Sequence, residues 1–140
     1  ILKIIKNNWE NDYACVNISI IPDDDINFTI SEDFLQVIFD NLILNSIQQN
    51  DALNHLEIAI RITHSGEFLY FSYFDNGKGL DKKYLTNPEK ILEVHETTRK
   101  SGHGLGMWIV NNTITMSGGK ISQINGENGF HIDFTLGESK

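Results

Sequence analysis

The sequence predicts an α+β fold, a two-layer sandwich in which helices cover a mixed, mainly antiparallel sheet. Two observations predict it: short segments in which apolar and polar residues alternate, as in strands, and longer segments with the apolar period of a helix. Strands are expected over residues 13–21, 26–30, 56–64, 68–74, 120–123 and 130–136. Helices are expected over residues 1–10, 31 to about 49, and 107–117.

Capping and turn residues separate these elements. Ser31 stands where it can cap the second helix, whose first turn is then acidic. Ser65-Gly66 is expected to turn the chain between two antiparallel strands. Gly118-Gly119 is expected to close the last helix, because glycine accepts the backbone conformation that ends a helix. The order of elements therefore alternates helices with strands along the chain.

A long connection covers residues 80–101. It has no strong period, contains Pro88 and carries many charges. Connections of this length in a compact domain are uncommon, and many of them serve function. We therefore predict a mobile lid over this segment.

Length and charge indicate one domain over residues 1–140. A chain of 140 residues with 40% hydrophobic content can bury one core and leaves little room for a second. No apolar run approaches the ~18 residues of a membrane span, so we expect a cytoplasmic domain without direct membrane contact. The net charge of −8 argues against a nucleic-acid partner. The start at Ile1, inside a helical pattern, is expected of a fragment of a longer protein.

Two glycine-rich clusters stand out. The first is Asp75-Asn76-Gly77-Lys78-Gly79-Leu80, and the second is Gly102-His103-Gly104-Leu105-Gly106. Glycine-rich turns present successive backbone N–H groups, which form anion sites, and the start of a helix adds a positive dipole end. Phosphate is the expected ligand. Taken singly, either cluster is more often an ordinary turn.

A pair of asparagines lies upstream, at positions 41 and 45 of the predicted second helix. The i,i+4 spacing of Asn41 and Asn45 places them one turn apart on one helix face, beside an apolar stripe. Polar amides next to such a stripe need partners. Taken alone, the pair is equally two satisfied surface amides.

The order of these three elements resembles the N, G1 and G2 boxes of the GHKL ATP-binding family, and sensor histidine kinases fit best. Residues 90–99 resemble the F box of these kinases, and residues 109–121 resemble the helix and Gly-Gly-Lys-Ile segment that follows. The resemblance covers about residues 16–136. It implies the Bergerat-type fold of this family, a two-layer α/β sandwich, and ATP and Mg²⁺ as ligands.

The resemblance also implies roles for single residues. A carboxylate at Asp75 can accept the exocyclic amine of adenine and disfavours guanine, although Asp-Asn-Gly is also a common turn. Asn45 is implied as the Mg²⁺ ligand, and Arg99 as a lid cation for the γ-phosphate. The implied nucleotide-binding set is Asn41, Asn45, Asp75, Gly77, Gly79, Thr98, Arg99, Gly102, His103, Gly104, Leu105 and Gly106.

The reaction depends on what attacks the γ-phosphate. GHKL hydrolases such as gyrase and Hsp90 carry a glutamate base one turn before the magnesium asparagine, and here that position is Asn41. Asp40 is displaced by one residue, about 100° around the helix, and should point elsewhere. The sequence therefore indicates no catalytic base.

Transfer to a histidine is the function that we predict. The resemblance implies a histidine kinase catalytic domain that presents the γ-phosphate to a His on a separate dimerisation domain, expected upstream in the same protein, with a response regulator as further partner. The parent protein can be membrane-anchored. A GHKL-type ATPase and a non-catalytic ATP-gated module stay open as alternatives, and anti-sigma serine kinases share the fold.

Overall fold

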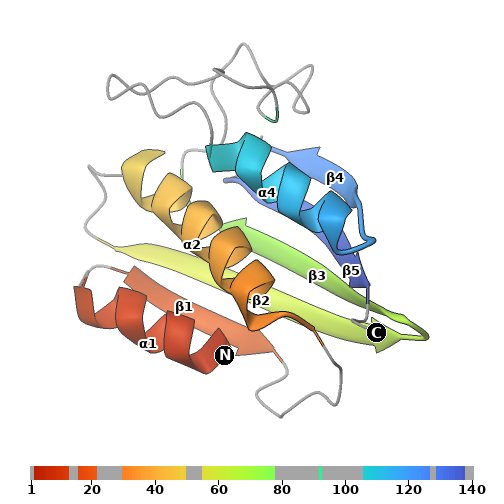
Figure 1. Ribbon diagram of the computed structural model, residues 1–140. Coiled ribbons are helices and arrows are strands. Elements are labelled where there is room, and N and C mark those ends of the chain that lie inside the picture. The colour runs from red at the N-terminus through yellow and green to blue at the C-terminus, as the bar shows by residue number, and fades with distance from the viewer. Residues whose placement is uncertain are drawn as a thin grey trace.

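Three helices lie side by side on one face of a five-stranded sheet in the described part of the chain (Figure 1). The computed structural model describes residues 2–12, 16–21, 30–49, 55–77, 92, 106–126 and 129–137. The helices are α1 (Leu2–Asp12), α2 (Glu32–Gln49) and α4 (Gly106–Met116). The strands are β1 (Val16–Ile21), β2 (Leu56–Ser65), β3 (Phe68–Asp75), β4 (Ile121–Asn125) and β5 (His131–Gly137).

The sheet is mixed, in the order β1-β2-β3-β5-β4. Its first two strands run parallel, with Val16 opposite Leu56, and the other pairs are antiparallel. Along β2 and β3 buried and more exposed residues alternate, because one face of the sheet packs on the helices and the other does not. The predicted fold class, an α+β two-layer sandwich with a mainly antiparallel sheet, is confirmed.

Element boundaries differ from the prediction by a few residues. The β2–β3 turn is formed by Gly66 and Glu67, one residue later than predicted, because Ser65 still pairs with Phe68. The strand predicted over residues 26–30 falls mostly outside the described residues, and Ile30, which is described, belongs to no strand. The predicted lid over residues 80–101 also lies outside them, apart from Leu92.

The predicted helix ends are present. Ser31 Oγ accepts the N–H of Phe34 at 3.3 Å, which caps the start of α2. At the end of α4, Gly118 has a φ of +82°, and the N–H of Gly119 bonds the carbonyl of Ile114 at 3.0 Å. This positive φ is the reason for glycine at that position.

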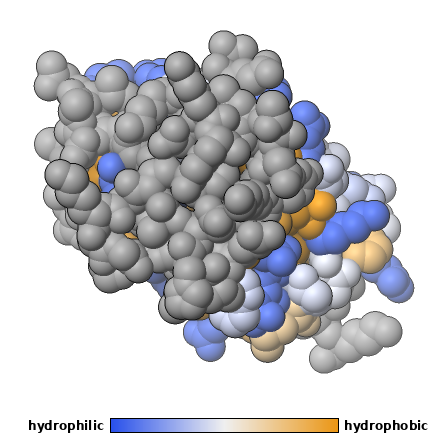
Figure 2. Space-filling model, turned by 90° about the horizontal axis from the view of Figure 1, so that it is seen from above, coloured by the Kyte–Doolittle hydropathy of each residue, from blue (hydrophilic) through white to orange (hydrophobic). Residues whose placement is uncertain are grey.

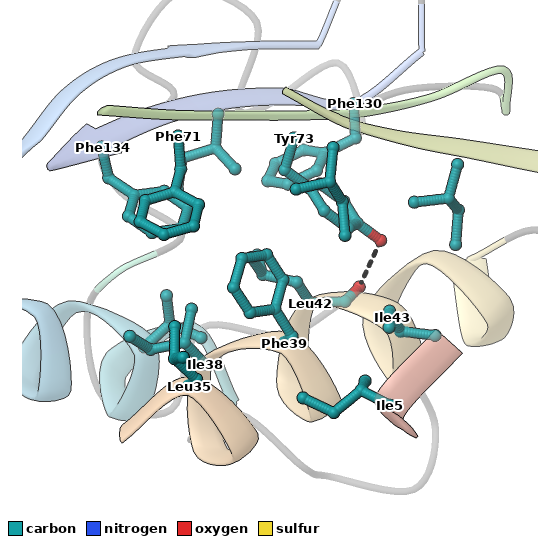
Figure 3. Close-up of a cluster of buried hydrophobic side chains, with 14 of the residues drawn as sticks. Ile5, Leu35, Ile38, Phe39, Leu42, Ile43, Phe71, Tyr73, Phe130 and Phe134 are labelled. Atoms are coloured by element: carbon teal, nitrogen blue, oxygen red, sulfur yellow. Dashed lines mark hydrogen bonds between the residues drawn. The ribbon is translucent and has the colours of Figure 1, made fainter. Parts of the chain in front are cut away.

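Aromatic residues fill the core between helix α2 and the sheet (Figure 3). The Phe39 ring lies 5.6 Å from that of Phe71 and 6.0 Å from that of Phe134, and the latter two stack at 5.1 Å. Burying a side chain of this size contributes roughly 1.5–3 kcal/mol. Tyr73 continues this layer towards the end of β3, so the core leads directly to Asp75.

Helix α1 packs beside α2 and binds the carboxylate of Asp40, a residue of α2. The indole N–H of Trp9 donates to Asp40 Oδ1 at 2.8 Å, and the Gln36 amide donates to Asp40 Oδ2 at 2.6 Å. Both oxygens of Asp40 therefore face α1 and the preceding turn of α2. The expectation that Asp40 points elsewhere than Asn41 is confirmed.

Glu10 joins α1 to the edge strand β1. Its Oε2 accepts the backbone N–H of Ile18 at 2.8 Å, and its Oε1 pairs with Lys6 Nζ at 2.7 Å. Burial acts to raise the pKa of Glu10, but the hydrogen bond from Ile18 and the charge of Lys6 outweigh it and lower the pKa below its ordinary 4.5. A lowered pKa means that the ionised form stabilises the fold.

We expect Glu10→Gln to lower the free energy of unfolding at about pH 7 by less than about 1 kcal/mol, because the group is near solvent. The wild-type advantage should be complete above the ordinary pKa and disappear as the pH falls through the lower, folded-state value. Urea unfolding at about pH 7 and about pH 3 measures it, with the exposed turn variant Glu67→Gln as control. Equal stability of Glu10→Gln and wild type at about pH 7 would contradict the prediction.

Candidate functional site

Asp75 ends strand β3 with its side chain on the helix-facing side of the sheet, 4% exposed. Its Oδ1 accepts the backbone N–H groups of Gly77 at 2.9 Å and Phe130 at 3.1 Å. Its Oδ2 accepts the hydroxyl of Ser46 at 2.7 Å. All three partners donate, so both carboxylate oxygens act only as acceptors here.

The backbone around Asp75 is fixed from two sides. Its N–H donates to the carbonyl of Phe130 at 3.0 Å. Gly129 has a φ of +86°, and a Cβ there would lie 2.2 Å from the Asp75 carbonyl oxygen, so only glycine allows this approach. On the other side, Asn76 exchanges hydrogen bonds with the backbone of Glu57, at 3.0 and 2.9 Å. The start of the first glycine cluster is thus held in place by its neighbours.

A chain of hydroxyl groups connects Asp75 to helix α2. Ser46 Oγ lies 2.7 Å from Tyr73 Oη, and Tyr73 Oη donates to the carbonyl of Leu42 at 3.1 Å (Figure 3). Burial raises the pKa of Tyr73 well above its ordinary value of 10.0; the hydrogen bond with Ser46 opposes this rise and the nearby charge of Asp75 adds to it. Tyr73 is therefore a neutral phenol that can donate.

The two asparagines lie on α2, both half-buried. Asn41 donates its amide N–H to the Val37 carbonyl at 2.7 Å, so its nitrogen is bound to its own helix. Asn45 directly precedes Ser46, which touches Asp75. The C-terminal end of α2 and the N-terminal end of α4, which begins at Gly106, lie at the same end of the molecule (Figure 1).

The structure thus brings Asp75 and Gly77 together with the segment of α2 that carries Asn45. Figure 2 shows the molecule from above, and the described residues that are visible on this face mix hydrophilic and hydrophobic side chains. Asn41 and Gly106 are also described, whereas the seven remaining predicted site residues lie outside the described part of the chain. These are Gly79, Thr98, Arg99, Gly102, His103, Gly104 and Leu105.

Among the described residues, no three His, Cys, Asp or Glu side chains form a group that could hold a metal. None of the helices in the described part of the chain is long and apolar enough to cross a membrane.

Two members of the site received no role from the sequence, Ser46 and Tyr73. A signal was present for the first: Ser46 follows Leu42 by four residues, on the buried stripe of α2, and a buried hydroxyl needs a partner. The sequence could not name that partner. Tyr73 and Asp75 come from a strand 27 and 29 residues further along the chain.

Comparison with known proteins assigns the family. Residues 30–140 match the family described as histidine kinase-, DNA gyrase B-, and HSP90-like ATPase. The chain belongs to this family. The GHKL resemblance drawn from the N, G1 and G2 boxes is therefore confirmed.

The curated relatives are sensor histidine kinases. The chain is 31% identical over 124 residues to the sensor histidine kinase WalK of Bacillus subtilis, covering 83% of this chain and 20% of WalK. It is 34% identical over 96 residues to ZraS of Escherichia coli, covering 69% of this chain and 19% of ZraS. The chain thus spans about a fifth of the length of these relatives. It is an ATP-binding domain of the histidine kinase type.

Solved structures share the fold. The catalytic domain of the histidine kinase ThkA matches with a TM-score of 0.76 at 20% identity, covering 99% of this chain and 90% of that one. The mycobacterial sensor histidine kinase MprB matches with a TM-score of 0.72 at 14% identity, covering 94% and 88%. The Bergerat-type sandwich is therefore the fold of this chain.

Proposed function

We propose that this chain binds Mg-ATP and presents the γ-phosphate to a histidine on a separate domain, as the catalytic part of a histidine kinase. The observation that carries the proposal is that Asp75, at the start of the first glycine cluster, is surrounded by donors and acts only as an acceptor. A carboxylate held in this way accepts a hydrogen bond from the 6-amino group of adenine. It repels the 6-oxo group of guanine, because two acceptors would then meet.

The rest of the nucleotide follows from the family. Gly77 and Gly79 would lie against base and sugar, and Gly102, Gly104 and Gly106 would bind the polyphosphate at the start of α4. Thr98, Arg99, His103 and Leu105 would complete the site from the segment before α4, and Asn41 from α2. Asn45 would bind Mg²⁺ through its amide oxygen, which fits because the side chain is only half-buried and a neutral oxygen suits this ion. Bound Mg²⁺ would neutralise phosphate charge.

Transfer to an external group is the reaction that fits the residues of α2. Asn41 is an amide and cannot take a proton from water, and both oxygens of Asp40 are bound by Trp9 and Gln36. Because neither Asn41 nor Asp40 can serve as a base for water, these residues favour a nucleophile that comes from another domain. In the proposed reaction a histidine nitrogen forms a bond to the γ-phosphorus, the bond to the bridging oxygen breaks, and ADP leaves.

The partners are then a phosphoacceptor dimerisation domain, which we place upstream in the same protein, and a response regulator. We place the domain in the cytoplasm, with or without a membrane anchor elsewhere in its parent. A GHKL-type ATPase or an ATP-gated module is what a failure of phosphotransfer would indicate.

Calorimetric titration tests the binding. We expect ADP to bind at least about tenfold more tightly than GDP, and Mg²⁺ to strengthen the binding of ADP and ATP. In Asn45→Ala, nucleotide affinities with and without Mg²⁺ should differ by no more than about twofold, because the variant lacks a ligand of the ion. The affinity measured without metal should be retained, because the substitution removes no core contact. Asn112→Ala, which removes an exposed amide of α4, is the matched control and should leave the effect of Mg²⁺ intact.

Two results would count against the proposal, the first against nucleotide recognition at Asp75 and the second against the role of Asn45. One is equal affinity for ADP and GDP, or no binding of either at millimolar concentration. The other is an unchanged effect of Mg²⁺ in Asn45→Ala, which would remove Asn45 from the metal site.

A further inference from the structure

Ser46 binds the one oxygen of Asp75 that no described backbone group reaches. The backbone N–H groups of Gly77 and Phe130 both bind Oδ1, whereas the Ser46 hydroxyl binds Oδ2 at 2.7 Å. Ser46 is itself 1% exposed and comes from helix α2, not from the strand that carries Asp75. The orientation of the carboxylate therefore depends on a contact between the two layers of the fold.

The remaining binding capacity of Asp75 can be counted. An ionised carboxylate offers about four lone-pair positions, two on each oxygen. The described donors fill both positions on Oδ1 and one on Oδ2. One position is left for a ligand. Because Ser46 occupies the neighbouring lone pair of Oδ2, it also fixes the direction in which the free position points.

Tyr73 supports this arrangement from behind. A hydroxyl has one proton, and that of Ser46 is directed to Asp75. The one proton of Tyr73 is therefore shared between two acceptors, the carbonyl of Leu42 at 3.1 Å and Ser46 Oγ at 2.7 Å. Tyr73 is fully buried and is held between Ser46 and the carbonyl of Leu42. With either acceptor for Tyr73, Ser46 donates its proton to Asp75, and Asp75 is the acceptor at the end of the hydroxyl chain.

We propose that Ser46 is a positioning residue for base recognition, which orients Asp75 Oδ2 so that its last free lone pair accepts the 6-amino group of adenine. The inference rests on the proposed function, because it assumes that an adenine nucleotide binds at Asp75. What the inference adds is that the hydroxyl of Ser46 strengthens the binding of nucleotides that carry the 6-amino group and not of nucleotides in general.

The test compares two ligands that differ only in that amine, ADP and purine riboside 5′-diphosphate. Wild type should prefer ADP by about tenfold or more. In Ser46→Ala the affinity for ADP should fall about five- to tenfold and that for the purine analogue should stay within about twofold, so the preference should fall below about threefold. A variant that merely loosened the fold would weaken both ligands alike.

Thr135→Val is the matched control for loss of a buried hydroxyl. Thr135 Oγ1 accepts the N–H of Lys120 at 3.1 Å near the opposite end of the sheet, opposite Tyr70. This variant should lose stability and keep the wild-type preference for ADP. Ser46→Cys is a second variant, in which a weak thiol donor replaces the hydroxyl, and it should show a preference between those of Ser46→Ala and wild type.

The outcomes separate the two hypotheses. Absence of ADP binding by the wild type overturns the proposed function and this inference with it. If the wild type prefers ADP and either folded Ser46 variant keeps the full preference, the inference alone is overturned. If the preference disappears in Ser46→Ala and remains in Thr135→Val, the positioning role is established.

Discussion

Replacing Asp75 by asparagine is expected to weaken ADP binding about ten- to a hundredfold, equivalent to roughly 1.5–3 kcal/mol, because a charge-assisted hydrogen bond is lost. The asparagine oxygen can take the place of Oδ1 and accept the N–H groups of Gly77 and Phe130. Its amide nitrogen then stands where Oδ2 was. That nitrogen presents a donor to the amine of adenine, so the contact changes from attraction to conflict.

The fold should survive this change, because the hydroxyl chain can reverse. The new amide donates to Ser46 Oγ, Ser46 donates to Tyr73 Oη, and Tyr73 donates to the carbonyl of Leu42, at the distances already present. None of the side chains in the rearranged hydroxyl chain, which are the new amide at position 75, Ser46 and Tyr73, is then left without a hydrogen-bond partner. We therefore expect the loss in ligand affinity to exceed the loss in the free energy of unfolding.

Calorimetry with ADP and urea unfolding of the same variant measure the two quantities. Asp133→Asn is the matched control: it makes the same chemical change on β5, where the carboxylate bonds His131 and is partly exposed. The control should bind ADP as the wild type does. A change in ADP affinity of less than about threefold in folded Asp75→Asn would mean that Asp75 is only a turn residue.

Local signals explain why most elements could be predicted from the sequence. The apolar period of α2, the cap at Ser31 and the positive φ at Gly118 each depend on residues within a few positions of one another. The β2–β3 turn was predicted one residue early. Both Ser65-Gly66 and Gly66-Glu67 contain the required glycine, and only the pairing of Ser65 with Phe68 decides between them.

The site could be predicted only in part, because its contacts are far apart in sequence. Asp75 was identified by the resemblance of the three ordered boxes to the GHKL family, since Asp-Asn-Gly alone is also a common turn. Ser46 binds it across 29 residues and Phe130 across 55, and neither distance leaves a local pattern. Gly129 is needed because its backbone passes close to the Asp75 carbonyl, which is a property of the folded sheet. Sequence therefore located the acceptor, and the structure supplied the groups that orient it.

The isolated chain is expected to hydrolyse ATP negligibly and to leave itself unlabelled. Asn41 offers no proton acceptor, and its amide N–H is bound to the carbonyl of Val37. Asn41→Glu should raise the rate of hydrolysis by at most about tenfold, because no neighbouring residues are arranged to orient the new carboxylate. A positioned base supplies a factor of roughly 100–10,000. Phosphate release and retention of γ-labelled phosphate measure the two reactions.

Asp40→Asn is the decisive control for the reaction type, since Asp40 is the carboxylate nearest in sequence to the hydrolases' base. Its two oxygens are bound by Trp9 and Gln36, so the substitution should weaken the contact between α1 and α2 and leave hydrolysis at its negligible level. Brisk hydrolysis by the wild type that Asp40→Asn abolishes would make the chain a GHKL ATPase with Asp40 as base. Mixing the chain with the histidine-bearing domain of its parent should instead produce an acid-labile label on that domain, because the nucleophile that α2 lacks is then provided by the partner.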